Sequence, residues 1–128
     1  MSDVEKITIN LGVVDLGKVD LLVDQGYYSH RTDFIRTAIR NQLHMHRDEV
    51  GKIVTEKIMV VGVVRYDARG LQELMRHGEQ LAVRVVGLFH LRDDVTPELA
   101  QQTIQSVKVL GVFRASDQVK AALAPRIR

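Results

Sequence analysis

Three polar side chains near the start of the chain can bind a polar partner through hydrogen bonds. Lys6, Thr8 and Asn10 carry an amine, a hydroxyl and an amide, and one residue separates each from the next. A spacing of two places them on one face of a β-strand. The sequence contains no Walker loop, G-x-S-x-G elbow, H-E-x-x-H helix or paired metal-binding motif. The pattern therefore indicates recognition rather than catalysis, and we expect no enzyme activity.

A second set of polar side chains recurs with an internal repeat. The segments M-V-V-G-V-V-R, R-V-V-G-L-F-H and K-V-L-G-V-F-R have glycines 25 and 24 residues apart and end on Arg65, His90 and Arg114. Stacked parallel strands would align these three residues into a row. Such a row could bind an anion, an acidic partner or DNA phosphate, or form an oligomer interface. A solvated sheet face is the alternative that we favour.

The first polar set needs a strand and two helices to position it. Residues 6–14 alternate apolar and other side chains, which predicts a half-buried strand. Asp15 is placed to cap a helix over 16–25, and Gly26 to end it. Ser29 is placed to cap a second helix from about His30 to Asp48, whose apolar residues are spaced by three and four.

This strand-helix-helix unit is too small to fold alone. A lone strand leaves both edges unpaired, and two short helices supply too little core below about forty to fifty residues. A second copy solves both problems, because two strands can pair as an antiparallel ribbon over four helices. The sequence thus predicts an intertwined homodimer for residues 1–50.

Residues 51–128 are predicted to form a separate domain. Each repeated strand precedes a short helical stretch, at Leu71–His77, Thr96–Ile104 and Asp117–Ala124. The near-continuous apolar strands favour parallel pairing. The fold class is therefore α+β and α/β, with a small βαβαβα repeat domain after the N-terminal unit. The βαββαβ sandwich of ligand-sensing domains is an alternative, but its fourth strand is not found.

Residues Lys6–Leu43 resemble ribbon-helix-helix proteins of the CopG and nickel-responsive repressor type. The resemblance rests on the strand alternation, the G-Y-x-S-x-R-S/T-D/E turn and the F-I-R-x-A-I-R helix, all present in order. It covers about a third of the chain. It implies a bacterial-type, homodimeric transcriptional regulator whose two-stranded ribbon enters the major groove of double-stranded DNA.

The resemblance also implies roles for individual residues. The outward residues of the ribbon would be Lys6, Thr8 and Asn10. Lysine suits the acceptors of guanine, asparagine suits adenine, and threonine can contact either of these bases. The start of the second helix would hold a DNA phosphate through free N–H groups. The residues at that helix start are Ser29, His30, Arg31 and Thr32.

The resemblance raises the question of a metal site in this chain, because the nickel-responsive members of the family bind their metal through histidines and a cysteine. This chain has no cysteine, and His77 and His90 are the histidines after residue 50. His44 and His46 are two apart, so on a helix they point to different sides. A metal pair there would need the helix to have ended or two subunits to contribute. We therefore expect no cofactor.

Charge distribution and hydropathy limit how the protein can bind DNA and where it is located. Residues 1–50 carry six Lys and Arg against eight Asp and Glu, whereas residues 51–128 carry twelve against eight. DNA binding by the N-terminal unit must therefore depend on which face the charges occupy, not on bulk charge. No apolar run approaches the length of about 18 residues that a membrane span needs, and the start does not read as a signal peptide. A cytoplasmic location is expected.

Together these features favour a repressor or dual regulator. Two dimers would bind adjacent half-sites, so that a tetramer or a higher oligomer could form on the DNA. Residues 51–128 would set the oligomeric state or sense a signal. An antitoxin or plasmid-partition protein is the first alternative, although antitoxins commonly end in a flexible tail. A self-assembling scaffold whose N-terminal unit merely dimerises is the second.

Overall fold

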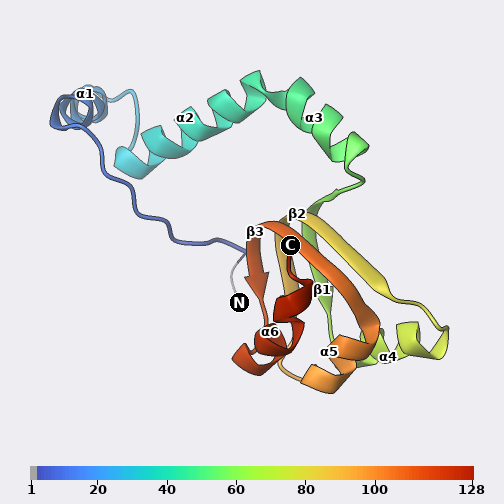
Figure 1. Ribbon diagram of the computed structural model, residues 1–128. Coiled ribbons are helices and arrows are strands. Elements are labelled where there is room, and N and C mark those ends of the chain that lie inside the picture. Colours follow the sequence, from blue (N-terminus) through green and yellow to red (C-terminus); the bar gives the residue numbers. More distant parts are fainter. Residues whose placement is uncertain (1–2) are drawn as a thin grey trace. The chain divides into compact units, whose positions relative to one another are not determined.

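The computed structural model describes residues 3–128, which divide into two compact units (Figure 1). One unit is Lys6–Ile53, and the other joins residues 3–5 to Val54–Arg128. No helix within the described residues is long and apolar enough to cross a membrane. In chain order the elements are α1 (Val13–Asp24), α2 (Arg31–Met45), α3 (Arg47–Glu56), β1 (Val60–Tyr66), α4 (Ala68–Arg76), β2 (Leu81–Leu91), α5 (Pro97–Thr103), β3 (Ile104–Arg114), α6 (Asp117–Leu123) and the 3₁₀ turn η1 (Ala124–Arg126).

Helix α1 starts earlier than the sequence predicted and ends one residue earlier, at Asp24, with Gly26 terminating it as predicted. Gly12 is the N-cap, so the assignment of Asp15 as the cap was wrong; Asp15 lies in the first turn, where its charge complements the helix dipole. At the other end Gly26 adopts a left-handed φ of 84°. Its N–H donates to the Val23 carbonyl and that of Tyr27 to the Leu22 carbonyl, which is a Schellman motif.

The predicted strand at residues 6–14 is not formed within one chain. Residues 4–12 lie outside any helix or strand, and Val13 and Val14 already belong to α1. The end of the predicted strand was therefore two residues too late. The remaining segment has no partner strand in a single chain, and a β-strand exists only through the hydrogen bonds of a ladder.

The second helix is shorter than predicted, and a third follows it. Helix α2 ends at Met45, whereas the sequence suggested Asp48. His46 leaves helical geometry, and the Arg47 guanidinium donates to the His44 carbonyl at 3.1 Å. Helix α3 then begins at Arg47, and the sequence analysis missed it.

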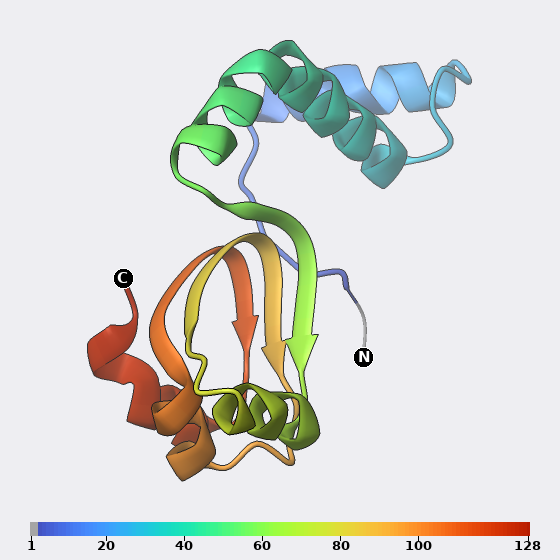
Figure 2. The same ribbon diagram turned by 90° about the vertical axis from the view of Figure 1, so that its right-hand side faces the viewer.

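The C-terminal unit contains a parallel sheet in the order β1-β2-β3. The repeat predicted its register correctly, because Gly62 pairs with Gly87 and Gly87 with Gly111. Strands β2 and β3 begin earlier than predicted, at Leu81 and Ile104. The helices α4, α5 and α6 follow their strands, and Figure 2 shows them gathered near the arrowheads of the sheet.

The hydrophobic core lies between one face of the sheet and these helices. Phe89 of β2 is fully buried there and stacks on Phe113 of β3 with ring centroids 5.4 Å apart. Leu71, Val119 and Leu123 contribute from the helices, and each is at most 1% exposed. The opposite face keeps large apolar side chains exposed, among them Val61 at 62% and Leu110 at 52%.

Candidate nucleic-acid interface

The segment that precedes α1 presents its polar side chains to solvent. Lys6, Thr8 and Asn10 are all exposed. The apolar residues between them are exposed as well, with Ile7 at 72% and Ile9 at 54%. A segment in which both faces are open offers its whole backbone and both side-chain rows to partners.

An open apolar hollow lies beside this segment within the same unit. Its volume is about 470 Å³. Ile9 and Leu11 line one part of it, and residues of α1 and α2 line the rest. The α2 residues include Phe34, Ile35 and Ile39, which form an apolar stripe along the helix. In a single chain that stripe is incompletely covered, since Ile39 stays 46% exposed.

The start of α2 is built differently from the prediction. His30 is the N-cap, and its Nδ1 accepts the Asp33 N–H at 3.1 Å. The Ser29 N–H in turn donates to the Asp33 carboxylate at 2.9 Å. The prediction of Ser29 as the cap was therefore wrong by one residue. The N–H groups of Arg31 and Thr32 precede the helical hydrogen bonds and stay available to an anion.

Arg31 is held by a carboxylate of the neighbouring helix. Its Nε and Nη2 donate to the two oxygens of Asp20 at 2.7 and 2.8 Å, a bidentate pair. The hydrogen bond from Arg31 lowers the pKa of Asp20, and the pKa of Arg31 is raised in return. Both side chains remain about half exposed, so an incoming phosphate could compete for the guanidinium.

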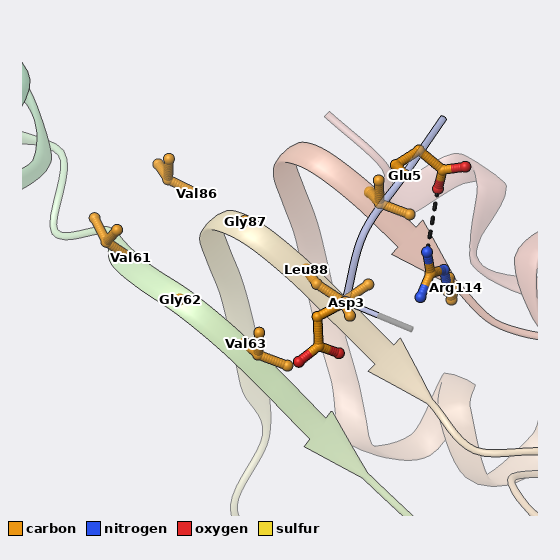
Figure 3. Close-up of a pocket in the computed structure, with 10 residues that line it drawn as sticks. Asp3, Glu5, Val61, Gly62, Val63, Val86, Gly87, Leu88 and Arg114 are labelled. Carbon is orange, nitrogen blue, oxygen red and sulfur yellow. Dashed lines mark hydrogen bonds and ion pairs between the residues drawn. The ribbon is translucent and has the colours of Figure 1, made fainter. Parts of the chain in front are cut away.

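The row Arg65, His90 and Arg114 is aligned across the three strands, as the repeat predicted. Two acidic residues from the beginning of the chain bind its outer members. Asp3 pairs with Arg65, and Glu5 pairs with Arg114 at 3.3 Å. Figure 3 shows Glu5 reaching Arg114, with Asp3 beside Val63 and Leu88. The row is therefore not a simple solvated face.

His90 in the middle of the row is only 6% exposed. Burial lowers its pKa, and the charges of Arg65, Arg92 and Arg114 lower it further, while Asp93 opposes them. A lowered pKa means that the folded protein binds fewer protons here than the unfolded chain does. This contribution to stability is present above the ordinary histidine pKa of about 6.5 and is lost as the pH falls below it.

Replacing His90 with phenylalanine should make stability less sensitive to mild acid. Between pH 7.5 and 5.5 the wild type is expected to lose more unfolding free energy than His90→Phe, because the variant has no imidazole to protonate at this position. Urea unfolding of both proteins at the two pH values measures the difference. An identical loss in both proteins would show that His90 does not contribute.

His44 and His46 are the histidine pair that the sequence offers for metal binding. Helix α2 does end before His46, which meets one of the two conditions for a pair with His44. His44 Nε2, however, lies 3.2 Å from the Arg47 guanidinium, and His46 Nε2 lies 3.4 Å from Gln42. Within residues 3–128 no three His, Cys, Asp or Glu side chains gather around a point that could hold a metal ion.

Four acidic residues contact the candidate site residues, and none of these contacts was predicted from the sequence. They are Asp3, Glu5, Asp20 and Asp33. Asp33 stands three residues after the His30 cap, but its carboxylate accepts from Ser29, so a search for a Ser or Thr cap followed by Glu or Gln would not have found it. Asp20 lies eleven residues from Arg31, and its partner follows only from how α1 packs on α2. Asp3 and Glu5 meet residues more than sixty positions away, so no local pattern reveals them.

Comparison with known proteins extends the likeness well beyond the N-terminal unit. A model of the ribbon-helix-helix transcriptional regulator family matches residues 2–120, so the matched region includes all three sheet strands. An uncharacterised protein of Methanocaldococcus jannaschii is 30% identical over 78 residues, which cover 56% of this chain and 80% of that protein. No solved structure matches the chain significantly.

Proposed function

The chain belongs to the ribbon-helix-helix transcriptional regulator family, and on that premise we propose that it is a sequence-specific DNA-binding regulator. We propose further that it is a repressor, and that it acts as a homodimer without a cofactor. Two copies of the segment beginning at Lys6 pair as an antiparallel ribbon. The ribbon enters the major groove, where Lys6, Thr8 and Asn10 contact base edges. The start of α2, residues 29–32, holds a phosphate on each side.

The observation that carries this proposal is that residues 6–11 are exposed and have no pairing partner among the described residues of a single chain. They lie outside any helix or strand, beside an apolar hollow that one chain leaves open. Pairing with a second copy would satisfy the backbone of both segments and bury Ile9 and Leu11 against two sets of helices. No bulk positive charge is needed, since a ribbon brings its few donors directly to the bases.

The C-terminal unit is proposed to modulate this activity. Its strands and helices form an ordered core, unlike the flexible tail common in antitoxins. We assign it a role in signal sensing or in joining two dimers on adjacent half-sites.

Sequencing the genomic DNA fragments that the purified protein retains at moderate salt tests the proposal. We expect a short, twofold-symmetric sequence to be enriched upstream of genes, and Asn10→Ala to lose that enrichment while remaining dimeric by light scattering. No enrichment with the wild type would contradict the proposal. Filaments that grow regardless of duplex DNA would instead favour a scaffold.

The salt bridge between Arg31 and Asp20 yields a separate prediction. Asp20→Asn releases the guanidinium to a phosphate, so the Kd for the retained sequence should fall about threefold or more, and the salt dependence should steepen. Asp24→Asn is the matched control, since it makes the same charge change at the end of the same helix. Fluorescence anisotropy at several salt concentrations measures both. If the two variants behave alike, Arg31 makes no phosphate contact that Asp20 limits.

A further inference from the structure

The basic row stands at the carboxyl ends of the three parallel strands. Arg65, His90 and Arg114 pair in register there, two residues beyond the apolar row of Val63, Leu88 and Val112. Alternation along the strands places both rows on the sheet face opposite the core. Because neighbouring parallel strands lie about 4.8 Å apart, the three side chains are held close together at this edge of the sheet. The row thus occupies a favourable position for a ligand.

An open hollow of about 370 Å³ lies over this face. Its lining is apolar at Val63, Leu88 and Val112 and charged at Arg114, and the chain's own Asp3 and Glu5 complete it (Figure 3). A hollow with an apolar floor and a cationic edge suits a ligand with an apolar body and acidic ends.

Among the described residues, His90 is the member of the row whose side chain has a buried polar atom without a hydrogen-bond partner. The residue is 6% exposed, and its Nδ1 is buried without a hydrogen-bond partner among the residues that the structure describes. Buried polar atoms in proteins nearly always have a partner, so an exception needs an explanation. With an arginine on either side, an acceptor of negative charge fits best beside this nitrogen.

Asp3 and Glu5 show which chemistry the arginines accept. Asp3 binds Arg65, while Arg114 contacts the Glu5 carboxylate and the Val4 carbonyl, each at 3.3 Å. Both acidic side chains are about half exposed, and exposed ion pairs are weak enough to be exchanged for another anion. An extended chain advances about 3.3 Å per residue, so the two carboxylates leave the backbone about 7 Å apart.

We propose that the basic row is a binding site for a small dicarboxylate. Its two carboxylates replace those of Asp3 and Glu5 at Arg65 and Arg114, one of them accepts a hydrogen bond from His90, and its methylene chain lies on Val63, Leu88 and Val112. Binding releases residues 3–5, which lead directly into Lys6. On the proposed function, the ligand therefore alters the freedom of the DNA-reading ribbon.

Isothermal titration calorimetry of the full-length protein with succinate, adipate and suberate tests the site. We expect one of these to bind one per chain, and acetate to bind too weakly to detect. The double variant Asp3→Asn/Glu5→Gln should bind that dicarboxylate about tenfold more tightly, because no internal carboxylate competes. Arg114→Gln should weaken binding by at least about tenfold. Lys108→Gln, which removes a charge from the middle of β3, outside the lining of the hollow, should leave it unchanged.

Three results would overturn the proposal. They are the absence of binding by every dicarboxylate, an effect of Lys108→Gln as large as that of Arg114→Gln, or inorganic phosphate binding as tightly as the best dicarboxylate. These titrations contain no DNA. A negative result would therefore leave the proposed DNA binding intact, and a failure to bind DNA would leave a positive titration standing.

Discussion

Replacing Lys6 with alanine is expected to raise the Kd for the retained DNA sequence by about two orders of magnitude or more. A good side-chain contact to a base edge contributes roughly 1–3 kcal/mol of discrimination, and a twofold dimer loses two such contacts at once. Lys6 is exposed and lies outside any helix or strand, so the substitution should not disturb folding. Fluorescence anisotropy against specific and scrambled duplexes measures the change.

Arg92→Ala is the matched control for Lys6. It removes the same charge from an exposed residue of the C-terminal unit, and its backbone N–H still donates to the Tyr66 carbonyl. We expect its Kd to stay within about twofold of the wild type once salt is controlled. Equal losses in the two variants would mean that net charge, rather than the ribbon, determines binding.

Replacing Gly87 with alanine is expected to destabilise the C-terminal unit severely. The added Cβ would lie 2.1 Å from the Gly62 carbonyl oxygen and 3.0 Å from its carbonyl carbon, both backbone atoms of the adjacent strand. Gly87 also has a φ of 138°, which side chains rarely adopt. Relief would require β1 and β2 to separate, so we expect a loss exceeding about 4 kcal/mol.

The variant Gly62→Ala distinguishes the cost of backbone strain from the cost of a steric clash with the neighbouring strand. Gly62 has nearly the same φ, 139°, but a Cβ there would meet no atom within 4 Å. Strain alone should cost about 1–3 kcal/mol. Urea unfolding followed by circular dichroism measures both variants. If Gly62→Ala and Gly87→Ala are equally destabilised, close approach of the strands is not what requires glycine.

The same glycines explain how much of the C-terminal unit could be predicted. Their spacing aligned the three strands and the row Arg65, His90 and Arg114 correctly, because a parallel register follows directly from a repeat. The early starts of β2 and β3 were missed, since the preceding residues lack the repeated pattern. The pairing of Asp3 and Glu5 with the row depends on tertiary placement alone.

Prediction was less complete for the N-terminal unit. The glycine at 26 and the apolar spacing of α2 located both helices. The caps were misplaced because Gly12 and His30 serve there, whereas side-chain preference favoured Asp15 and Ser29. Helix α3 carries Val50, Ile53 and Val54 at helical spacing, but the second helix was predicted to end at Asp48 and no helix was predicted over this stretch. The strand predicted at residues 6–14 has no pairing partner among the described residues of a single chain, so its pairing stays a prediction.

Amide hydrogen exchange at residues 7–11 tests the central claim most directly, since it reports whether the segment pairs between two copies. The measurement uses the full-length protein without DNA, at concentrations where light scattering shows a dimer. A paired ribbon predicts alternate amides exchanging at least about tenfold more slowly than in an unstructured peptide, with the protection lost on dilution to monomer. Exchange at the unstructured rate in the dimer would contradict the ribbon.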